Sequence, residues 1–498
     1  MKRGEKVAIV CCSNGQNIKN KNQIEQLICT LEKIGLIPIV SEYIYAKDSC
    51  FSGTAQERAE QLMRFYEDDE IKAIFDVSGG DIANEILPYL DFELIAKSDK
   101  KFWGYSDLTT ILNAIYTKTG KISVLYQIRN LIYDDSENQI QNFTNTVMKN
   151  QSDLHDVEYT FLQGTEMKGI LVGGNIRCLL KLAGTEYWPD MNGKILLLEA
   201  FGGKAPQMIT YLSQLKQLGV FEKIQGIILG TFTAMEQEGV IPHMKELIKD
   251  YAGKTTPIAY TKEIGHGVDS KAMVIGQEIE IGLPREIIRH ISGQKYSIDE
   301  IGMSNSTVMV FEDKVLKIQP ETEETKKELI MLEWLAGKLP VPKQICHVSE
   351  QGRSYLLMSK IKGKMSCTDE YMENPKLLVS ILAQSLKRLW EIDIAECPVR
   401  RELNKPGEEL VFSHGDFCMP NIFIQNGELA GYIDLGRSGV ADKWQDIALC
   451  YRSLKDNFSG KYATKIYEEF DPNLLFEELG VEPDWNKINY YMLLDELL

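Results

Sequence analysis

The chain is 498 residues long, about three times the usual size of a domain, so its length favours three compact units over one core. Hydrophobic residues make up 44% and charged residues 26%, a composition that excludes a disordered or fibrous chain. The net charge of −17 repels phosphate backbones and anionic lipid, so no nucleic acid and no membrane is expected as a partner. A cationic small substrate would be attracted, although an acidic surface that only keeps the protein in solution explains the same charge.

The N-terminal residues predict a first strand and not a signal peptide. Residues 7–12 form only a short apolar run, and no small-residue cleavage site follows it. No apolar run approaches the roughly eighteen residues that a membrane helix needs, so we expect a cytoplasmic protein. The ten cysteines show neither Cys-x-x-Cys nor zinc-site spacing and are expected to be reduced structural thiols. They stand at positions 11, 12, 29, 50, 178, 346, 367, 397, 418 and 450.

Up to residue 90, short apolar runs alternate with stretches of helical periodicity. The runs predict strands and the stretches predict helices, in the order of a parallel sheet covered by helices. Strands are expected at 6–12, 37–40 and 73–76, and helices at 23–34, 54–65 and 82–90. The turn after the first strand reads Cys-Cys-Ser-Asn-Gly and lacks the glycines of a dinucleotide-binding fingerprint. A nucleotide-binding Rossmann domain is therefore disfavoured.

The pattern changes twice further along the chain. From about Gly169, short β-like runs surround one clear helix at 205–218, so a domain change is expected near residue 160. Leu283-Pro284 and a short helical stretch then precede a strand-rich segment with a helix at 325–336 and mainly helical sequence beyond. Further strands are expected at 169–172, 194–199, 226–229, 273–275, 278–281, 308–310, 315–318 and 354–358. The predicted domains are 1–160, 161–282 and 283–498.

A serine stands where an apolar strand turns into a helix. Residues 101–110 read Lys-Phe-Trp-Gly-Tyr-Ser-Asp-Leu-Thr-Thr, and a helix is expected at 108–116. This turn would lift the hydroxyl of Ser106 clear of the sheet and direct it to the positive end of the helix, as a serine nucleophile requires. The complete Gly-x-Ser-x-Gly elbow is absent because Leu108 stands at its last position, and a plain helix cap is an alternative interpretation.

Three further segments would complete such a nucleophile. Gly79-Gly80 at a strand end can present backbone N–H groups to a developing oxyanion. Glu199 ends a strongly apolar strand, where an unpaired charge would be costly, so it is expected to have a partner. His266 stands between glycines in a loop. Each also fits an ordinary turn or edge, but together His266 would take the Ser106 proton and Glu199 would hold the imidazole.

These segments, with Gly-Gly-Asn at 173–175 between them, resemble in the same order the LD-carboxypeptidase family of serine peptidases and the related microcin C immunity peptidases. The resemblance covers about residues 4–282. It implies an α/β fold with a Rossmann-like N-terminal lobe and a β-rich C-terminal lobe. It also implies a catalytic triad of Ser106, Glu199 and His266 in the cleft between the lobes.

The same resemblance implies how a substrate is cleaved. The backbone amides of Gly80 and Asp107 would form the oxyanion hole, and no cofactor is needed. The family releases a terminal D-amino acid, typically D-alanine, from cell-wall peptides (muropeptides). Two departures leave the substrate open, because the turn reads Ser-Gly-Gly-Asp and Ala-Phe-Gly-Gly follows Glu199. The alternative is a peptidyl-nucleotide antibiotic, for whose base Tyr187 and Trp188 are the nearest stacking candidates, although core packing also explains both.

A second group of polar residues lies near the C-terminus. Residues 411–423 read Val-Phe-Ser-His-Gly-Asp-Phe-Cys-Met-Pro-Asn-Ile-Phe, and Asp434 follows at the end of the next hairpin. Asp416 can accept a hydroxyl proton, while Asn421 and Asp434 offer oxygen ligands for Mg²⁺. This spacing is much less expected by chance than any of the motifs described above, so it predicts phosphoryl transfer.

Two segments upstream have the parts of a phosphate-binding site. Lys317 is expected on a strand and Glu328 on the following helix, the arrangement of a lysine that contacts phosphates and is held by an ion pair. The turn Gly-Met-Ser-Asn-Ser at 302–306 would place Ser304 over the phosphates, although alone it is a plain hairpin.

From about residue 283 to the C-terminus, the sequence resembles the aminoglycoside 3'-phosphotransferases. The resemblance implies a protein-kinase-like α+β fold that uses ATP and Mg²⁺. The implied site residues are Asp416 as base, Asn421 and Asp434 as metal ligands, and Ser304, Lys317 and Glu328 as ATP-binding residues. The acidic C-terminus would meet a polyamine substrate through Asp495, Glu496 and the Leu498 carboxylate.

One departure affects this last domain. Only ten residues separate Cys397-Pro398 from Glu409, where the family carries a long helical insertion with acidic contacts to the drug. The domain is therefore expected to be shortened, and a non-catalytic binding or dimerisation module, in a homodimer, is the alternative. We predict a fusion of two enzymes. One is a serine LD-carboxypeptidase acting on cell-wall peptides, and the other is an ATP-dependent aminoglycoside kinase that gives antibiotic resistance.

Overall fold

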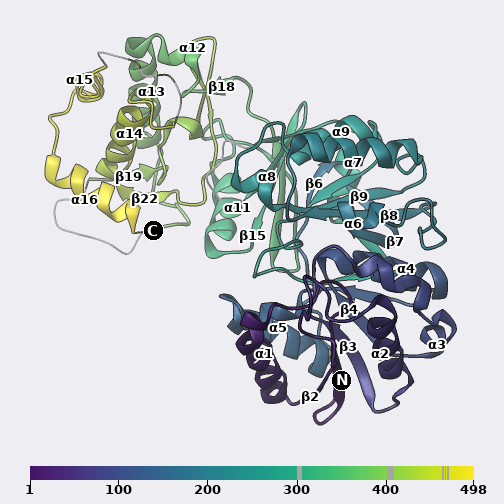
Figure 1. The fold of residues 1–498 in the computed structure, drawn as a ribbon. Coiled ribbons are helices and arrows are strands. Elements are labelled where there is room, and N and C mark those ends of the chain that lie inside the picture. Colours follow the sequence, from purple (N-terminus) through teal and green to yellow (C-terminus); the bar gives the residue numbers. More distant parts are fainter. Residues whose placement is uncertain (300–305, 401–408, 463–464, 466, 468–469, 498) are drawn as a thin grey trace. The chain divides into compact units, whose positions relative to one another are not determined.

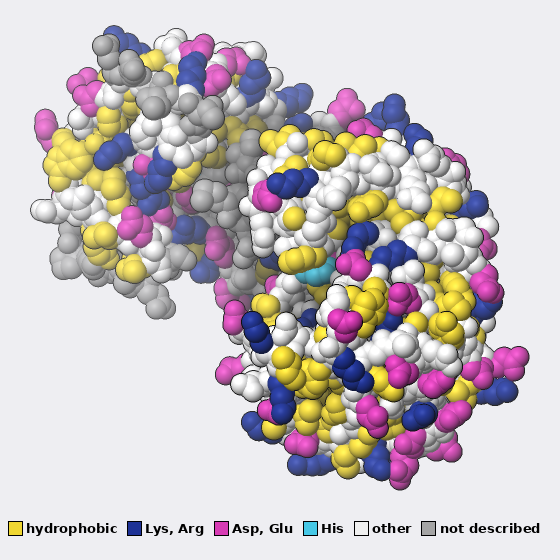
Figure 2. All heavy atoms as spheres, viewed as in Figure 1, with side chains coloured by type: hydrophobic (Ala, Val, Ile, Leu, Met, Phe, Trp, Pro, Cys, Tyr) yellow, Lys and Arg dark blue, Asp and Glu magenta, His cyan; other side chains and the backbone are white. Residues whose placement is uncertain are grey.

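The computed structural model describes residues 1–299, 306–400, 409–462, 465, 467 and 470–497 (Figure 1). Two predicted site residues, Ser304 and Leu498, lie outside the described residues. The chain divides into two compact units, Met1–Leu283 and Pro284–Leu498. Within the described ranges, no helix is long and apolar enough to cross a membrane. On the face drawn in Figure 2, acidic and basic side chains are interspersed, so the excess of acidic residues forms no single acidic patch there.

The first unit opens with a mostly parallel sheet. Its strand order is β11-β5-β4-β3-β1-β2, and every neighbouring pair is parallel except β11 and β5. The strands are β1 (Lys6–Val10), β2 (Ile37–Val40), β3 (Ile71–Asp76), β4 (Lys101–Gly104), β5 (Ser123–Leu125) and β11 (Met273–Ile275). The helices of this lobe are α1 (Lys21–Ile34), α2 (Ala55–Glu67), α3 (Phe92–Lys97), α4 (Thr109–Thr119) and α5 (Ser136–Lys149). They cover the sheet, as a parallel sheet requires.

Local sequence signals fix where these helices begin and end. α2 starts with a capping box in which Thr54 and Glu57 each bind the other's backbone N–H. α1 ends at Gly35, whose φ of 110° lies in the left-handed region that suits glycine. The core of this lobe is aromatic as well as aliphatic, because the Trp103 ring lies 5.5 Å from Phe75 and 5.9 Å from Phe143.

A second six-stranded sheet belongs to the same unit. Its order is β12-β7-β8-β9-β10-β6, in which β7 to β10 run parallel and the edge strands β12 and β6 are antiparallel. The strands are β6 (Thr160–Gln163), β7 (Glu166–Asn175), β8 (Lys194–Ala200), β9 (Gly226–Phe232), β10 (Ile258–Tyr260) and β12 (Glu278–Gly282). The helices are α6 (Ile176–Leu180), α7 (Ala205–Gln217), α8 (Thr233–Gln237) and α9 (Met244–Ala252).

Strand β11 connects the two lobes of this unit. The sequence predicts a strand at 273–275 within the second lobe, whereas the structure pairs it antiparallel with β5 in the first sheet. The next strand, β12, pairs with β7 in the second sheet. The chain therefore returns to the first sheet once before the second sheet is complete.

A close approach of β7 and β8 makes Gly173 sensitive to substitution. Its φ is 107°, and a Cβ atom there would lie 2.2 Å from the backbone oxygen of Leu197. Gly173→Ala is expected to lower the free energy of unfolding by about 3 kcal/mol, through left-handed strain and overpacking. Gly184→Ala is the matched control, since its φ is 79° but no atom lies within 4 Å of the added Cβ. We expect it to cost only about 1 kcal/mol. Urea unfolding measures both, and equal losses would contradict the steric argument.

The second unit begins with an antiparallel sheet of order β13-β14-β15-β17-β16. Its strands are β13 (Ser297–Asp299), β14 (Thr307–Val310), β15 (Lys314–Pro320), β16 (Gln344–Glu350) and β17 (Arg353–Ser359). Helix α10 (Arg285–Ile291) precedes the sheet, and α11 (Glu323–Leu335) follows β15.

The rest of this unit is mainly helical. Its helices are α12 (Asp369–Met372), α13 (Pro375–Trp390), α14 (Lys443–Phe458), α15 (Leu474–Leu479) and α16 (Trp485–Glu496). Two small sheets complete it: β18 (Lys364–Met365), β20 (Ile422–Gln425) and β21 (Glu428–Tyr432) in one, and β19 (Leu410–Ser413) and β22 (Gly439–Asp442) in the other. The core lies around α13 and α14, where Leu382, Leu386, Ile447 and Leu454 are fully buried. This arrangement is the expected α+β fold.

Two candidate active sites

Ser106 lies on a strained turn at the end of β4. Its φ of 56° puts a non-glycine residue in the left-handed region, which costs about 1–2 kcal/mol and persists where the surrounding structure imposes it. Gly104 has no room for a side chain, since a Cβ there would lie 2.6 Å from the Leu108 Cβ. The chain then enters the 3-10 turn Ser106–Leu108 and α4. The turn therefore has the sharp strand-to-helix course of a nucleophile elbow, although the second glycine is missing.

His266 lies between Ser106 and Glu199. Its Nε2 atom is 3.3 Å from Ser106 Oγ, and its Nδ1 atom is 2.8 Å from Glu199 Oε2. Glu199 is only 1% exposed, so the imidazole is the partner expected for this buried carboxylate. A Cβ on Gly265 would lie 1.9 Å from Thr231 Oγ1, and only glycine lets the histidine loop pass this close to β9. The fold thus brings three residues that are far apart in sequence into one row of hydrogen bonds.

The predicted oxyanion donors lie on two turns that are held by further hydrogen bonds. The carbonyl oxygen of Gly80 accepts a hydrogen bond from Arg177 Nη2 at 3.1 Å. The Asp107 carboxylate accepts from Ser13 Oγ at 2.7 Å and from the Ala83 amide at 2.8 Å. The side chain of Asp107 is therefore engaged in structure, and its backbone amide is the group that can serve an oxyanion.

Lys181 supports this site and escapes sequence analysis. Its Nζ atom donates to the fully buried Asp107 carboxylate at 2.5 Å and to the Asp81 carbonyl oxygen at 2.8 Å. The available signal is spacing, because Arg177 and Lys181 stand four residues apart after the helix-capping Asn175 and so share a helix face. Arg177 forms an ion pair with Asp81. The two cations together hold the turn that carries Gly80.

Lys181→Met is expected to lower the free energy of unfolding by about 3 kcal/mol, because the Asp107 carboxylate would stay buried without its cation. Lys21→Met removes an exposed ion pair with Glu25 and should change stability by less than about 0.5 kcal/mol. Denaturant unfolding of the full chain compares the two variants. If Lys181→Met lost as little stability as Lys21→Met, the hydrogen bonds from the Ser13 hydroxyl and the Ala83 amide would be sufficient to stabilise the buried Asp107 carboxylate.

Two aromatic rings flank the imidazole of His266. The ring centroids of Tyr105 and Phe201 lie 4.4 Å and 5.0 Å from it. Tyr105 is buried, and burial raises its pKa above the usual value, whereas Phe201 is 61% exposed. The two rings proposed from sequence for base stacking lie elsewhere: Tyr187 packs against another ring, and Trp188 packs on the core of the second sheet. Phe201 is thus the exposed ring beside the histidine.

In the second unit, Lys317 on β15 binds two carboxylates. Its Nζ atom is 3.0 Å from Glu328 Oε2 and 2.8 Å from Asp434 Oδ1. Burial lowers the pKa of Lys317, but the two carboxylates outweigh burial and hold the pKa above its usual value. The lysine therefore stays charged, and the ion pair with Glu328 predicted from sequence is formed.

Asp416 and Asn421 lie together in the loop that follows β19. Asn421 Nδ2 donates to Asp416 Oδ2 and to the Asp416 carbonyl oxygen, both at 3.0 Å. The amide oxygen of Asn421 is then the atom left for a cation. Behind this loop, the buried Asp446 accepts from the amides of His414 at 2.7 Å and Gly415 at 2.9 Å. These bonds fix the backbone that carries Asp416.

Asp434 has the same kind of backbone strain as Ser106, with a φ of 61°. Burial raises its pKa, but Lys317, with smaller contributions from His414 and Arg437, brings the pKa below its usual value, so the carboxylate is ionised. A carboxylate and an amide oxygen are ligands that Mg²⁺ accepts beside water and phosphate oxygens. The pair Asn421 and Asp434 therefore fits this ion.

The acidic C-terminal residues lie at the end of α16. Asp495 is 2.9 Å from Arg437 Nη1 and forms a second ion pair with Arg452. Glu496 is exposed. Because two arginines already neutralise Asp495, this carboxylate offers a cationic drug less attraction than its sequence position predicts. The arginines are distant along the chain, which is why sequence analysis does not find them.

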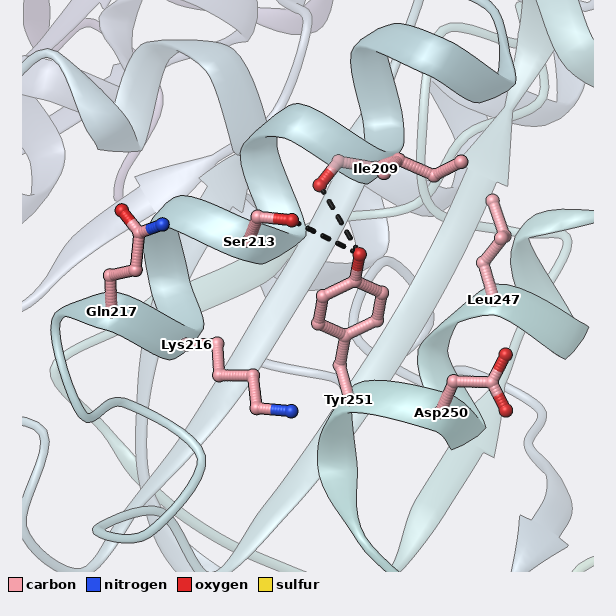
Figure 3. Close-up of a pocket in the computed structure, with 7 residues that line it drawn as sticks. All are labelled: Ile209, Ser213, Lys216, Gln217, Leu247, Asp250 and Tyr251. Atoms are coloured by element: carbon pink, nitrogen blue, oxygen red, sulfur yellow. Dashed lines mark hydrogen bonds between the residues drawn. The ribbon is translucent and has the colours of Figure 1, made fainter.

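A pocket lies between α7 and α9 in the first unit (Figure 3). The Tyr251 hydroxyl reaches across it to Ser213 Oγ at 3.1 Å and to the Ile209 carbonyl oxygen at 3.5 Å. Lys216 and Asp250 line it with opposite charges. None of its lining residues is a predicted site residue, so this pocket is separate from the Ser106 site.

Comparison with known proteins shows the family of each unit. Residues 7–127 match the LD-carboxypeptidase N-terminal domain, 168–281 match the LD-carboxypeptidase C-terminal domain, and 295–410 and 400–477 match the phosphotransferase enzyme family. An aminoglycoside 3'-phosphotransferase of Enterococcus faecalis is 37% identical over 219 residues, which cover 35% of this chain and 80% of that protein. The chain joins LD-carboxypeptidase N- and C-terminal domains to a domain of the aminoglycoside phosphotransferase family. Proteins of these two families act on peptide and aminoglycoside substrates, and the phosphotransferase family uses ATP.

The first unit is also similar to individual proteins and solved structures. The probable murein peptide carboxypeptidase of Bacillus subtilis (strain 168) is 26% identical over 323 residues, covering 62% of the fusion and 95% of that protein. The structure of MccF in complex with glutamyl sulfamoyl guanosine superposes with a TM-score of 0.52 at 21% identity, covering 57% and 94% of the two chains. A MccF-like protein from Bacillus anthracis str. Ames gives 0.50 at 24% identity, covering 57% and 95%. The unit shares the fold of these structures.

Proposed function

We propose that the first unit is a serine LD-carboxypeptidase that removes a terminal D-amino acid from cell-wall peptides. The supporting observation is the row of hydrogen bonds from Ser106 through His266 to Glu199. Ser106 Oγ would attack the amide carbon, and His266 would take its proton and pass it to the leaving nitrogen as the C–N bond breaks. The amides of Gly80 and Asp107 would bind the oxyanion. Water, activated by the same histidine, would then release the acyl group from the serine.

Incubation of the fusion with a muropeptide tetrapeptide ending in D-alanine tests this proposal. Mass spectrometry should find the tripeptide and free D-alanine. Absence of both products would reject the substrate, and formation of both without dependence on Ser106 would reject the mechanism.

A second substrate class is favoured by the exposed Phe201. Its ring lies beside the imidazole of His266 and has a free surface on which a nucleobase can stack. The microcin C7 self immunity protein MccF has been solved in complex with aspartyl sulfamoyl adenosine, which is therefore the probe. If the fusion is an immunity enzyme, it will hydrolyse this compound faster than the tetrapeptide, and Phe201→Ala will slow the hydrolysis about tenfold. The reverse order of rates would exclude this alternative.

We infer that the second unit transfers the γ-phosphoryl group of ATP to the 3'-hydroxyl of an aminoglycoside. The supporting observation is that Lys317 holds Glu328 and Asp434 together, near the residue types that phosphoryl transfer needs. Asp416 would accept the hydroxyl proton, and Lys317 would contact the phosphates. Asn421 and Asp434 would hold Mg²⁺, which neutralises phosphate charge when bound.

ATP-dependent phosphorylation of kanamycin, followed by mass spectrometry, tests this function. Because Arg437 and Arg452 neutralise Asp495, we expect a high KM for the drug, and the assay should extend to millimolar concentrations. No phosphorylation at any concentration would favour the alternative of a non-catalytic binding or dimerisation module.

A further inference from the structure

Arg129 is a half-buried arginine without a carboxylate partner. It lies on the 3-10 turn Ile128–Ile132, shortly after β5. Its Nη1 atom donates to Gln16 Oε1 at 3.5 Å, and in the part of the chain that the structure describes, no Asp or Glu side chain forms an ion pair with it. A partly desolvated charge without a counter-ion is unfavourable. A guanidinium in this state can gain by binding an anion from solution.

The neighbours of Arg129 place it at the candidate peptidase site. Gln16, its hydrogen-bond partner, donates to the Val77 carbonyl oxygen at 2.8 Å, at the start of the turn that carries Gly80. Asn130, the next residue, donates to the carbonyl oxygen of Gly267 at 3.4 Å, directly after His266. The Ile128–Ile132 turn is therefore tied both to the oxyanion turn and to the histidine loop.

The electrostatic effect of Arg129 on Tyr105 also places Arg129 near Ser106. Burial raises the pKa of this phenol, Glu199 raises it further, and the charge of Arg129 acts in the opposite direction. The guanidinium is thus within electrostatic range of the residue that directly precedes Ser106. The ring of Tyr105 in turn packs on the imidazole of His266.

The other cations of this region are already engaged. Arg177 pairs with Asp81, and Lys181 pairs with the buried Asp107. Glu199, which no Lys or Arg among the described residues neutralises, adds negative charge beside His266, and the chain as a whole carries −17. An anionic substrate would be repelled by these charges unless a free cation received it. Among these three cations of the described chain, Arg129 alone has no acidic partner.

We propose that Arg129 determines the specificity of the LD-carboxypeptidase unit by binding an oxyanion group of the substrate on the leaving side of the scissile amide. This assignment rests on the function proposed above. In a cell-wall peptide the group is the carboxylate of the terminal D-amino acid, and in a peptidyl nucleotide it is the sulfamoyl or phosphate group. Both present several oxygen atoms in the geometry that a guanidinium binds through two N–H donors. Binding there would make the unit an exopeptidase, because an internal peptide bond has no such charge next to it.

The test compares a tetrapeptide ending in D-alanine with its C-terminal amide, and includes aspartyl sulfamoyl adenosine. The wild-type fusion is expected to cleave the acid with a kcat/KM roughly 30-fold above that of the amide. Arg129→Met keeps the apolar stem and removes the charge, so it should lower kcat/KM for the acid by the same factor, mainly through KM, and leave the amide unchanged. Arg129→Lys should restore part of the preference.

Lys121→Met is the matched control, because it also removes one positive charge but from an exposed pair with Asp99, and it should alter neither rate. If Arg129→Met affects only aspartyl sulfamoyl adenosine, the anion bound is that of a nucleotide, and the assignment of the arginine still holds. If Arg129→Met keeps the wild-type ratio of kcat/KM for the acid to kcat/KM for the amide, and hydrolyses aspartyl sulfamoyl adenosine at the wild-type rate, the assignment of Arg129 is wrong. The proposed peptidase function would still stand. If the wild type cleaves none of the three compounds, the proposed peptidase function falls, and the assignment falls with it. Circular dichroism melting of each variant separates loss of binding from loss of fold.

Discussion

Replacement of Ser106 by alanine is expected to reduce peptide hydrolysis by a factor on the order of 10³ to 10⁶, because no other group in the row can form the acyl intermediate. The fold should be unaffected, since alanine adopts the same φ of 56° at a similar cost. Ser106→Gly is expected to be equally inactive but more stable by about 1 kcal/mol, because glycine relieves the left-handed strain. Release of D-alanine and urea unfolding measure the two effects separately.

Ser49 provides a matched control for this experiment. It is also a serine with positive φ, 48°, but it lies exposed on a turn. Ser49→Ala should keep full activity, and Ser49→Gly should give a comparable gain in stability. Hydrolysis at the wild-type rate by Ser106→Ala would remove this residue as the nucleophile. An equal stability of the alanine and glycine variants at position 106 would remove the argument from backbone strain.

For the phosphotransferase unit, Asp416→Asn is expected to lower the rate of ATP-dependent phosphorylation by about 10²- to 10⁴-fold, the usual contribution of a general base. Asparagine keeps the size of the side chain and can still accept the hydrogen bond from Asn421, so the loop should keep its shape. Loss of kcat with little change in KM for ATP is the expected signature. The mass gain of kanamycin is the measurement.

Asp313→Asn is the control for that loss, because its carboxylate also lies in the second unit but is 72% exposed. It should retain the wild-type rate. If Asp416→Asn phosphorylates as fast as Asp313→Asn, proton transfer to Asp416 does not limit the reaction, and positioning by Lys317, Asn421 and Asp434 would carry the catalysis.

The parts of both sites that sequence predicts are those marked by local patterns. Ser106 follows Gly104 at a strand end, His266 lies between glycines, and Asp416 and Asn421 stand five residues apart, so each can be found by reading a few neighbours. The structure places the first two within hydrogen-bond distance of each other and the last two likewise. Their chemical roles stay predictions that the experiments above test.

What sequence could not predict depends on contacts between distant segments. Lys181 reaches Asp107 across 74 positions of sequence, and no short pattern marks a cation that will bind a buried acid. The helix expected at 82–90 is a 3-10 helix, Ala83–Tyr89, because Pro88 lacks the N–H that an α-helix would use there. Sequence also does not predict that Arg129 lacks a carboxylate partner, because this depends on the ion pairs that Arg177 and Lys181 form with the nearby acids.

Strand β11 has a consequence for how the protein is made. During synthesis, the parallel sheet of the first lobe is complete only after residue 275 has emerged, because the strand that covers the edge of β5 comes from the end of the second lobe. Until then β5 exposes unpaired backbone groups to other nascent chains. An mRNA truncated between the sequences of the two lobes would therefore yield an aggregation-prone fragment and not a correctly folded lobe. A stop near residue 283 would leave the two sheets of the first unit with all their strands.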